Sequence, residues 1–143
     1  MDKITSVHFI GVGGVGMSGI AKVAHDQGLI VTGSDIRDSR YTQQLREAGV
    51  TIHIGHDAAN IAGVGKEDGP DVVVISTAVL ENNIELRAAK ERGLTIWHRA
   101  QMLAYLGTGL KTLAVAGTHG KTTTTYLVEH IAKRCGKRTG VIG

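Results

Sequence analysis

Short apolar runs alternate along the chain with segments whose apolar residues recur every three or four positions. The runs predict strands at residues 6–10, 29–32, 50–54, 71–75 and 94–97. Helical spacing and helix-ending glycines predict helices after the first strand and at residues 41–48, 83–92 and 98 onward, with a loop at 61–69. The alternation of the two patterns predicts an α/β fold, a Rossmann-like open parallel sheet flanked by helices.

A glycine-rich turn joins the first predicted strand to the first predicted helix. Gly11, Gly13 and Gly16 satisfy the pattern G-x-G-x-x-G, which is a weak signal in a chain with 20 glycines. Its place between a strand and a helix is typical of a diphosphate site, because the free N–H groups at the start of a helix attract anions. The residues expected to contact this diphosphate are Gly11, Gly13, Gly14, Val15, Gly16 and Met17.

An acidic residue follows the second predicted strand, which we expect to be closed by Gly33, Ser34 and Asp35. Asp35 lies 19 residues after Gly16, where the acid of a dinucleotide-binding fold bonds a ribose hydroxyl. The spacing alone therefore favours NAD(P), bound by a dehydrogenase or a regulatory module. A purely structural turn is the other interpretation.

Polar side chains also follow the other predicted strands. His56 follows the third strand, Ser76 and Thr77 the fourth, and Arg99 the fifth. Ligands of open parallel sheets bind at the edge formed by the carboxyl ends of the strands. The hydroxyl groups can bond a base, a ribose or a phosphate, and Arg99 can reach a diphosphate or a carbohydrate. A solvated loop histidine and a solvated arginine are the alternatives for His56 and Arg99.

A second glycine turn follows the apolar run at residues 112–116 and precedes a segment with helical spacing. Its string GTHGKT places free N–H groups in one concavity, where Lys121 can neutralise the outer phosphates of ATP and the Thr122 hydroxyl can ligate Mg²⁺. Val115 stands where the common phosphate loop has its first glycine, so this is a shortened variant. The residues expected to bind ATP are Gly117, Thr118, His119, Gly120, Lys121, Thr122 and Thr123.

The string AGTHGKTTTT resembles the ATP loop of the Mur ligase family, which builds the peptide of bacterial peptidoglycan. The strings IGVGGVGMSGIA and RAQML, which fits R-A-x-M-L, are also similar to the family. The resemblance implies that the first loop binds the diphosphate of a UDP-sugar, with Ser76, Thr77 and Ala78 in a ligand-binding turn. Ile84 stands where the family usually has proline, which puts the geometry of the neighbouring turn in doubt.

This resemblance also implies an activity. The implied enzyme uses ATP and Mg²⁺ to phosphorylate the carboxylate of UDP-N-acetylmuramate, and the amine of L-alanine then displaces phosphate; Lys121 would be the catalytic residue. A sister ligase that adds a tripeptide to the same nucleotide sugar is the alternative. We expect residues 1–107 to form the UDP-sugar domain and 108–143 the start of a truncated ATP-binding domain, so that the fragment alone is inactive.

Composition narrows the class of protein. The 143 residues include 16 basic and 13 acidic side chains, a balance with few aromatics that argues against a nucleic-acid partner. No apolar run has the length of a membrane span, and Cys135 is the one cysteine. No two histidines have zinc-ligand spacing with a carboxylate or thiol partner. We expect a cytoplasmic protein whose partners are small molecules.

Overall fold

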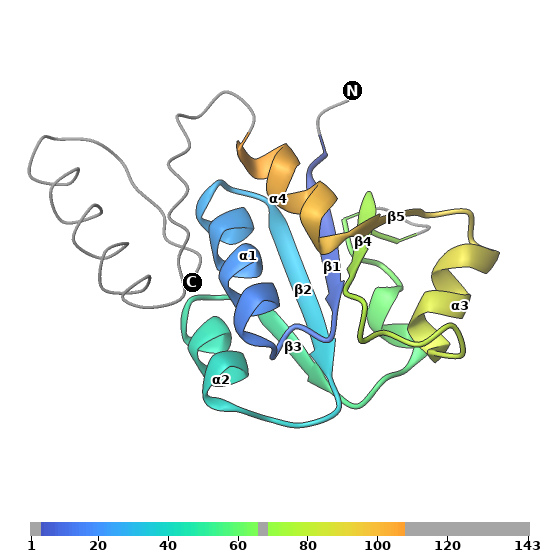
Figure 1. The fold of residues 1–143 in the computed structure, drawn as a ribbon, viewed down its shortest axis with the longest axis horizontal. Helices are drawn as coiled ribbons and strands as arrows, with labels where there is room; N and C mark the ends of the chain where they lie inside the picture. The colour runs from blue at the N-terminus through green and yellow to red at the C-terminus, as the bar shows by residue number, and fades with distance from the viewer. Residues whose placement is uncertain (1–3, 66–68, 108–143) are drawn as a thin grey trace, which may run out of the picture.

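The computed structural model describes residues 4–65 and 69–107, which form one parallel sheet with helices on both faces (Figure 1). The strands are β1 (Ser6–Ile10), β2 (Ile30–Asp35), β3 (Thr51–Ile54), β4 (Val72–Ile75) and β5 (Thr95–His98). The helices are α1 (Val15–Asp26), α2 (Arg40–Glu47), α3 (Ile84–Glu91) and α4 (Arg99–Gly107), with a 3₁₀ turn η1 (Ala58–Ile61). The expected Rossmann-like α/β fold is confirmed.

The strand order is β3-β2-β1-β4-β5, and every neighbouring pair is parallel. The chain first builds outward from β1 to β3 and then returns to the other side of β1 with β4. The carboxyl ends of β1 and β4 therefore flank the point where the order reverses. In open α/β sheets this is where ligands bind.

Two apolar clusters cover the two faces of the sheet. Along β4, Val72 and Val74 pack in the cluster that includes α1, α2 and α4, whereas Val73 and Ile75 pack with α3 and η1. This period of two is what a strand with both faces covered requires. The continuous apolar run of β4 is thus explained by helices on both sides of the sheet (Figure 1).

The predicted end of the second strand was wrong. β2 continues through Gly33, Ser34 and Asp35, which pair with β3, and Gly33 also pairs with Phe9 of β1. A β-carbon on Gly33 would lie 2.8 Å from the side chain of Val12. Glycine at this position therefore lets the loop after β1 approach the strand; it does not make a turn.

Helix and turn positions differ from the predictions only locally. η1 lies at Ala58–Ile61 and ends at the start of the loop predicted at 61–69. α2 begins after Ser39, whose side chain accepts a hydrogen bond from the Thr42 N–H in a capping box. Among the described residues no helix has the length and apolarity needed to cross a bilayer.

Candidate functional site

A hollow of about 560 Å³ opens at the carboxyl edge of the sheet. Its walls come from the loops after β1, β2, β3, β4 and β5, so it spans the point where the strand order reverses. This volume lies in the range of small-molecule sites. The lining residues are Ile10, Gly11, Gly14, Val15, Gly16, Met17, Asp35, Ile36, His56, Ser76, Ala78, Val79, Leu80, Asn82, Asn83 and Arg99.

The glycine loop is fastened to the neighbouring strand. The N–H groups of Gly11 and Val12 both donate to the carbonyl of Ser34, at 2.8 and 2.9 Å. Gly11 has a φ of 79°, a conformation that side chains rarely adopt. These bonds turn the chain sharply out of β1 and direct the start of α1 toward the hollow.

The amino end of α1 has no side-chain cap, because its N-cap residue is Gly14. In contrast, Ser39 caps α2 and Asn83 caps α3. The first N–H groups of a helix have no acceptor within the helix and carry partial positive charge. In α1 these groups belong to residues that line the hollow, which suits an anionic ligand.

Asp35 lies at the end of β2 and faces the glycine loop. Its Oδ2 accepts the N–H of Gly13 at 2.8 Å, and its Oδ1 accepts the N–H of Arg37 at 3.3 Å. A β-carbon on Gly13 would lie 2.8 Å from that Oδ2. Asp35 therefore holds the loop in place and also lines the hollow.

Arg99 brings a positive charge to the same loop from the opposite side of the site. It is the first residue of α4, and a β-carbon on Gly16 would lie 2.6 Å from its Nη1. No carboxylate pairs with Arg99 among residues 4–65 and 69–107. Its guanidinium and the amino end of α1 thus converge on one position, an arrangement that favours a phosphate or diphosphate group.

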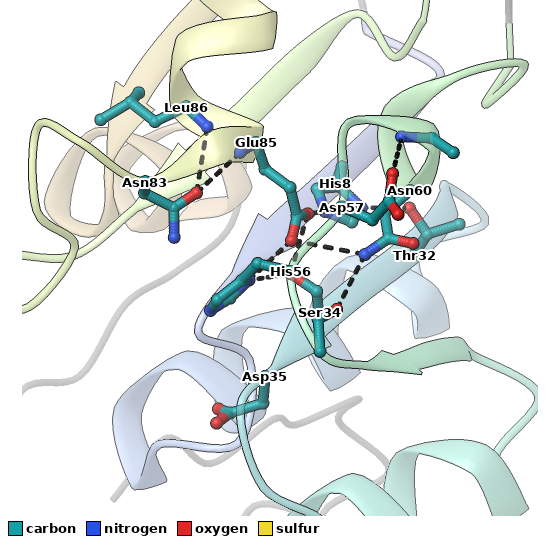
Figure 2. Close-up of polar contacts among 12 residues, drawn as sticks. His8, Thr32, Ser34, Asp35, His56, Asp57, Asn60, Asn83, Glu85 and Leu86 are labelled. Atoms are coloured by element: carbon teal, nitrogen blue, oxygen red, sulfur yellow. Dashed lines mark hydrogen bonds and ion pairs between the residues drawn. The ribbon is translucent and has the colours of Figure 1, made fainter.

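A buried polar cluster lies beside the hollow (Figure 2). Glu85, in the first turn of α3, is fully buried and accepts hydrogen bonds from His8 at 2.5 Å, His56 at 2.6 Å and Ser34 at 2.9 Å. Burial alone would raise the pKa of Glu85, but the hydrogen bonds and the attraction of His8 outweigh it and lower that pKa. Glu85 is therefore a carboxylate at neutral pH.

The hollow brings together most of the residues that the sequence predicted for this site. Those that line it are Gly11, Gly14, Val15, Gly16, Met17, Asp35, His56, Ser76, Ala78 and Arg99. Gly13 does not line it, and its N–H donates to Asp35. Thr77 is exposed and also outside the lining. The predicted ATP and Mg²⁺ residues, Gly117 to Thr123, lie outside the described residues.

Sequence reasoning missed an apolar rim and the buried cluster. Ile36 and Leu80 line the hollow although these residues are 70% and 67% exposed. Ile36 and Leu80 stand in loops after β2 and β4, so the rule that places ligands at the carboxyl edge would have found them. Glu85 and His8 had no such local signal. No group of acidic, histidine or cysteine side chains suited to a metal occurs in the described part.

The family model and the sequence relatives agree on one family. The model for "Mur ligase family, catalytic domain" matches residues 6–109. A UDP-N-acetylmuramate–L-alanine ligase of Symbiobacterium thermophilum is 52% identical over 137 residues, which are 95% of this chain and 27% of that protein. One from Hydrogenobaculum sp. is 48% identical over 94% of this chain and 29% of its own length. The chain thus spans less than a third of these relatives.

Solved structures give the same result. The UDP-N-acetylmuramate–alanine ligase of Thermotoga maritima superposes with a TM-score of 0.80 and 34% identity, covering 94% of this chain and 30% of that one. A murein peptide ligase of Psychrobacter arcticus superposes with a TM-score of 0.79 and 33% sequence identity. The match covers 92% of this chain and 27% of that one. Both similarities extend over nearly the whole chain.

Proposed function

The chain belongs to the Mur ligase family, and from this premise we propose that it is the part of a UDP-N-acetylmuramate–L-alanine ligase that binds the nucleotide sugar. The identity of about half the residues to two ligases of that name supports this substrate. The division into a UDP-sugar domain at 1–107 and the start of an ATP-binding domain at 108–143 belongs to the same proposal. So does the expected cytoplasmic location.

The observation that carries the proposal is the convergence of Arg99 with the uncapped start of α1 at Gly16. The diphosphate of UDP would lie there, balanced by the guanidinium and by the helix N–H groups. The nucleoside would extend toward Asp35, Ile36 and His56, since dinucleotide folds hold the ribose at the end of the second strand. The carbohydrate would then lie toward the loops after β4 and β5.

The chemistry of the parent ligase would take place beyond this pocket. The γ-phosphoryl group of ATP passes to the muramate carboxylate, giving an acyl phosphate and ADP. The amine of L-alanine then attacks the acyl carbon, and phosphate leaves. From the sequence, Lys121 would neutralise the transferring phosphoryl group and Thr122 would hold Mg²⁺, so that catalysis depends on electrostatic positioning.

Calorimetric titration of the chain with UDP, uridine and NAD⁺ tests this proposal. We expect UDP to bind, uridine to bind at least about tenfold more weakly because it lacks the diphosphate, and NAD⁺ not to compete. Uridine is the matched control because it keeps the base and ribose. Binding of NAD⁺ in preference to UDP would replace this proposal with the dinucleotide interpretation.

A sister ligase that transfers a peptide is the second candidate, because the murein peptide ligase of Psychrobacter arcticus superposes almost as well as the alanine ligase. The higher identity to the two alanine ligases favours L-alanine as the acceptor. Assay of the whole ligase with L-alanine and with a tripeptide separates the two. Turnover with the tripeptide alone would contradict our choice.

A further inference from the structure

The buried Glu85 side chain links the interior of the sheet to the wall of the hollow. It reaches from α3 between two imidazoles, His8 on β1 and His56 after β3 (Figure 2). Its Oε2 also lies 3.4 Å from the amide nitrogen of Asn60. Of the two histidines, His8 is completely buried, whereas His56 is 18% exposed and lines the hollow.

Donor and acceptor roles in this cluster determine the form of His56. A carboxylate accepts hydrogen bonds and donates none, so the Nδ1 of His56, 2.6 Å from Oε2, must carry the proton. Ser34 Oγ, 3.2 Å from the same Nδ1, already donates its own proton to Glu85 and can only accept a second bond from the ring. Both neighbours therefore require a protonated Nδ1.

We propose that Glu85, supported by His8, is a positioning residue that holds His56 in the Nδ1-protonated neutral form, so that its Nε2 accepts a hydrogen bond from the nucleoside part of the ligand. This inference rests on the proposed function and specifies one contact within it. The donor on the ligand would be the imide N–H of the base or a ribose hydroxyl. Glu85 itself does not touch the ligand.

His8 is the better place for the positive charge that balances the buried carboxylate. Its Nε2 contacts Glu85, and its Nδ1 lies 2.7 Å from the hydroxyl oxygen of Thr32, which can accept a hydrogen bond from the ring N–H as well as donate one to the ring. Attraction between His8 and the carboxylate is one of the causes that lower the pKa of Glu85. With the charge on His8, His56 stays neutral and its Nε2 stays an acceptor.

The position of His56 favours the nucleoside as its partner rather than the diphosphate. His56 follows β3, while the uncapped start of α1 follows β1 and Arg99 follows β5. The strand β2 lies between the loop that carries His56 and the glycine loop. A neutral acceptor on this side suits an N–H or O–H group and would repel a phosphate oxygen.

Nitrogen-15 NMR of the ligand-free chain near neutral pH tests the ring states without any ligand. We expect His56 to be protonated at Nδ1 alone and His8 at both ring nitrogens. Protonation of His56 at Nε2, in a neutral or a charged ring, would overturn the inference whether or not UDP binds. This measurement uses the unsubstituted chain, so its result does not depend on whether a variant folds.

Calorimetry with UDP then tests the coupling. Glu85→Gln can donate an amide proton to Nδ1 and so favours the opposite ring form, and we expect it to weaken UDP binding about tenfold. When Glu85→Gln is combined with His56→Ala, it should not weaken UDP binding further than His56→Ala does alone. Glu91→Gln, exposed on the same helix, is the matched control and should bind normally. An equal loss in both backgrounds would overturn the positioning role, and absence of UDP binding by the unsubstituted chain would instead overturn the proposed function.

Discussion

Gly33 gives the sharpest test of how the glycine loop is held. Substitution by alanine would place a β-carbon 2.8, 2.8 and 2.9 Å from three carbon atoms of Val12, where ordinary contacts begin at 3.4 Å. Val12 is completely buried and its N–H donates to Ser34, so its side chain cannot move aside freely. Gly33→Ala should therefore push the loop away from β2.

The loss of folding stability in Gly33→Ala can be estimated from these distances. Relieving the overlap requires a shift of about 0.6 Å in a buried, hydrogen-bonded segment, and overpacking of this kind costs about 1–3 kcal/mol. Alanine also restricts the unfolded chain, and this stabilises the folded state by about 0.4–1 kcal/mol. The net loss should be about 1–2 kcal/mol, which for a domain of this size lowers Tm by about 5–15 °C.

Thermal unfolding followed by circular dichroism measures this loss. The matched control is Gly14→Ala in the same loop, because Gly14 has an extended backbone and its β-carbon would meet nothing closer than 3.9 Å. Gly14 is the N-cap residue of α1, where alanine is less favourable than glycine, but alanine also restricts the unfolded chain. We therefore expect Gly14→Ala to lower Tm clearly less than Gly33→Ala does. A Gly33→Ala variant as stable as the unsubstituted chain, or a Gly14→Ala variant as unstable as Gly33→Ala, would refute the packing argument.

Three further predictions follow from the site. In calorimetry, Arg99→Ala should weaken UDP binding about tenfold and leave uridine binding unchanged, because only UDP has the diphosphate. Arg99→Lys should have a UDP affinity between those of the unsubstituted chain and Arg99→Ala. Equal losses of affinity for both ligands would contradict a diphosphate contact. Asp35→Ala should cost about 1–2 kcal/mol in urea unfolding because the Gly13 N–H loses its acceptor, and Asp35→Asn should cost less. The pKa of Glu85 is lowered in the folded chain, so its contribution to stability is present above the ordinary glutamate pKa and is lost as the pH falls through the folded value. Glu85→Gln should therefore flatten the acid limb of the stability curve, whereas an unchanged acid limb would show that other groups control it.

The parts of the fold that depend on neighbours in the sequence were predictable. The apolar run of β1, the glycine turn and the spaced apolar residues of α1 all follow one another within the chain. The same local order predicted most of the residues that line the hollow. The continuous apolar run of β4 fits a strand with helices on both faces, because a strand needs a polar face only where water reaches it.

The parts that depend on distant residues were not predictable from the sequence. Gly33 and Ser34 have the composition of a turn, but pairing with β1 and β3 on both sides extends the strand through them. The helix dipole favours a glutamate in the first turn of any helix, so its presence there does not indicate burial. Glu85 is buried because His8 and Ser34, from two other strands, supply its hydrogen bonds.

The most direct test of the account is an amide NMR titration of the chain with UDP. If the diphosphate caps α1, the N–H signals of Val15, Gly16 and Met17 should shift most, saturate with UDP and move little with uridine. Saturable UDP binding that leaves those three signals in place would contradict the central claim that the open start of α1 receives the diphosphate.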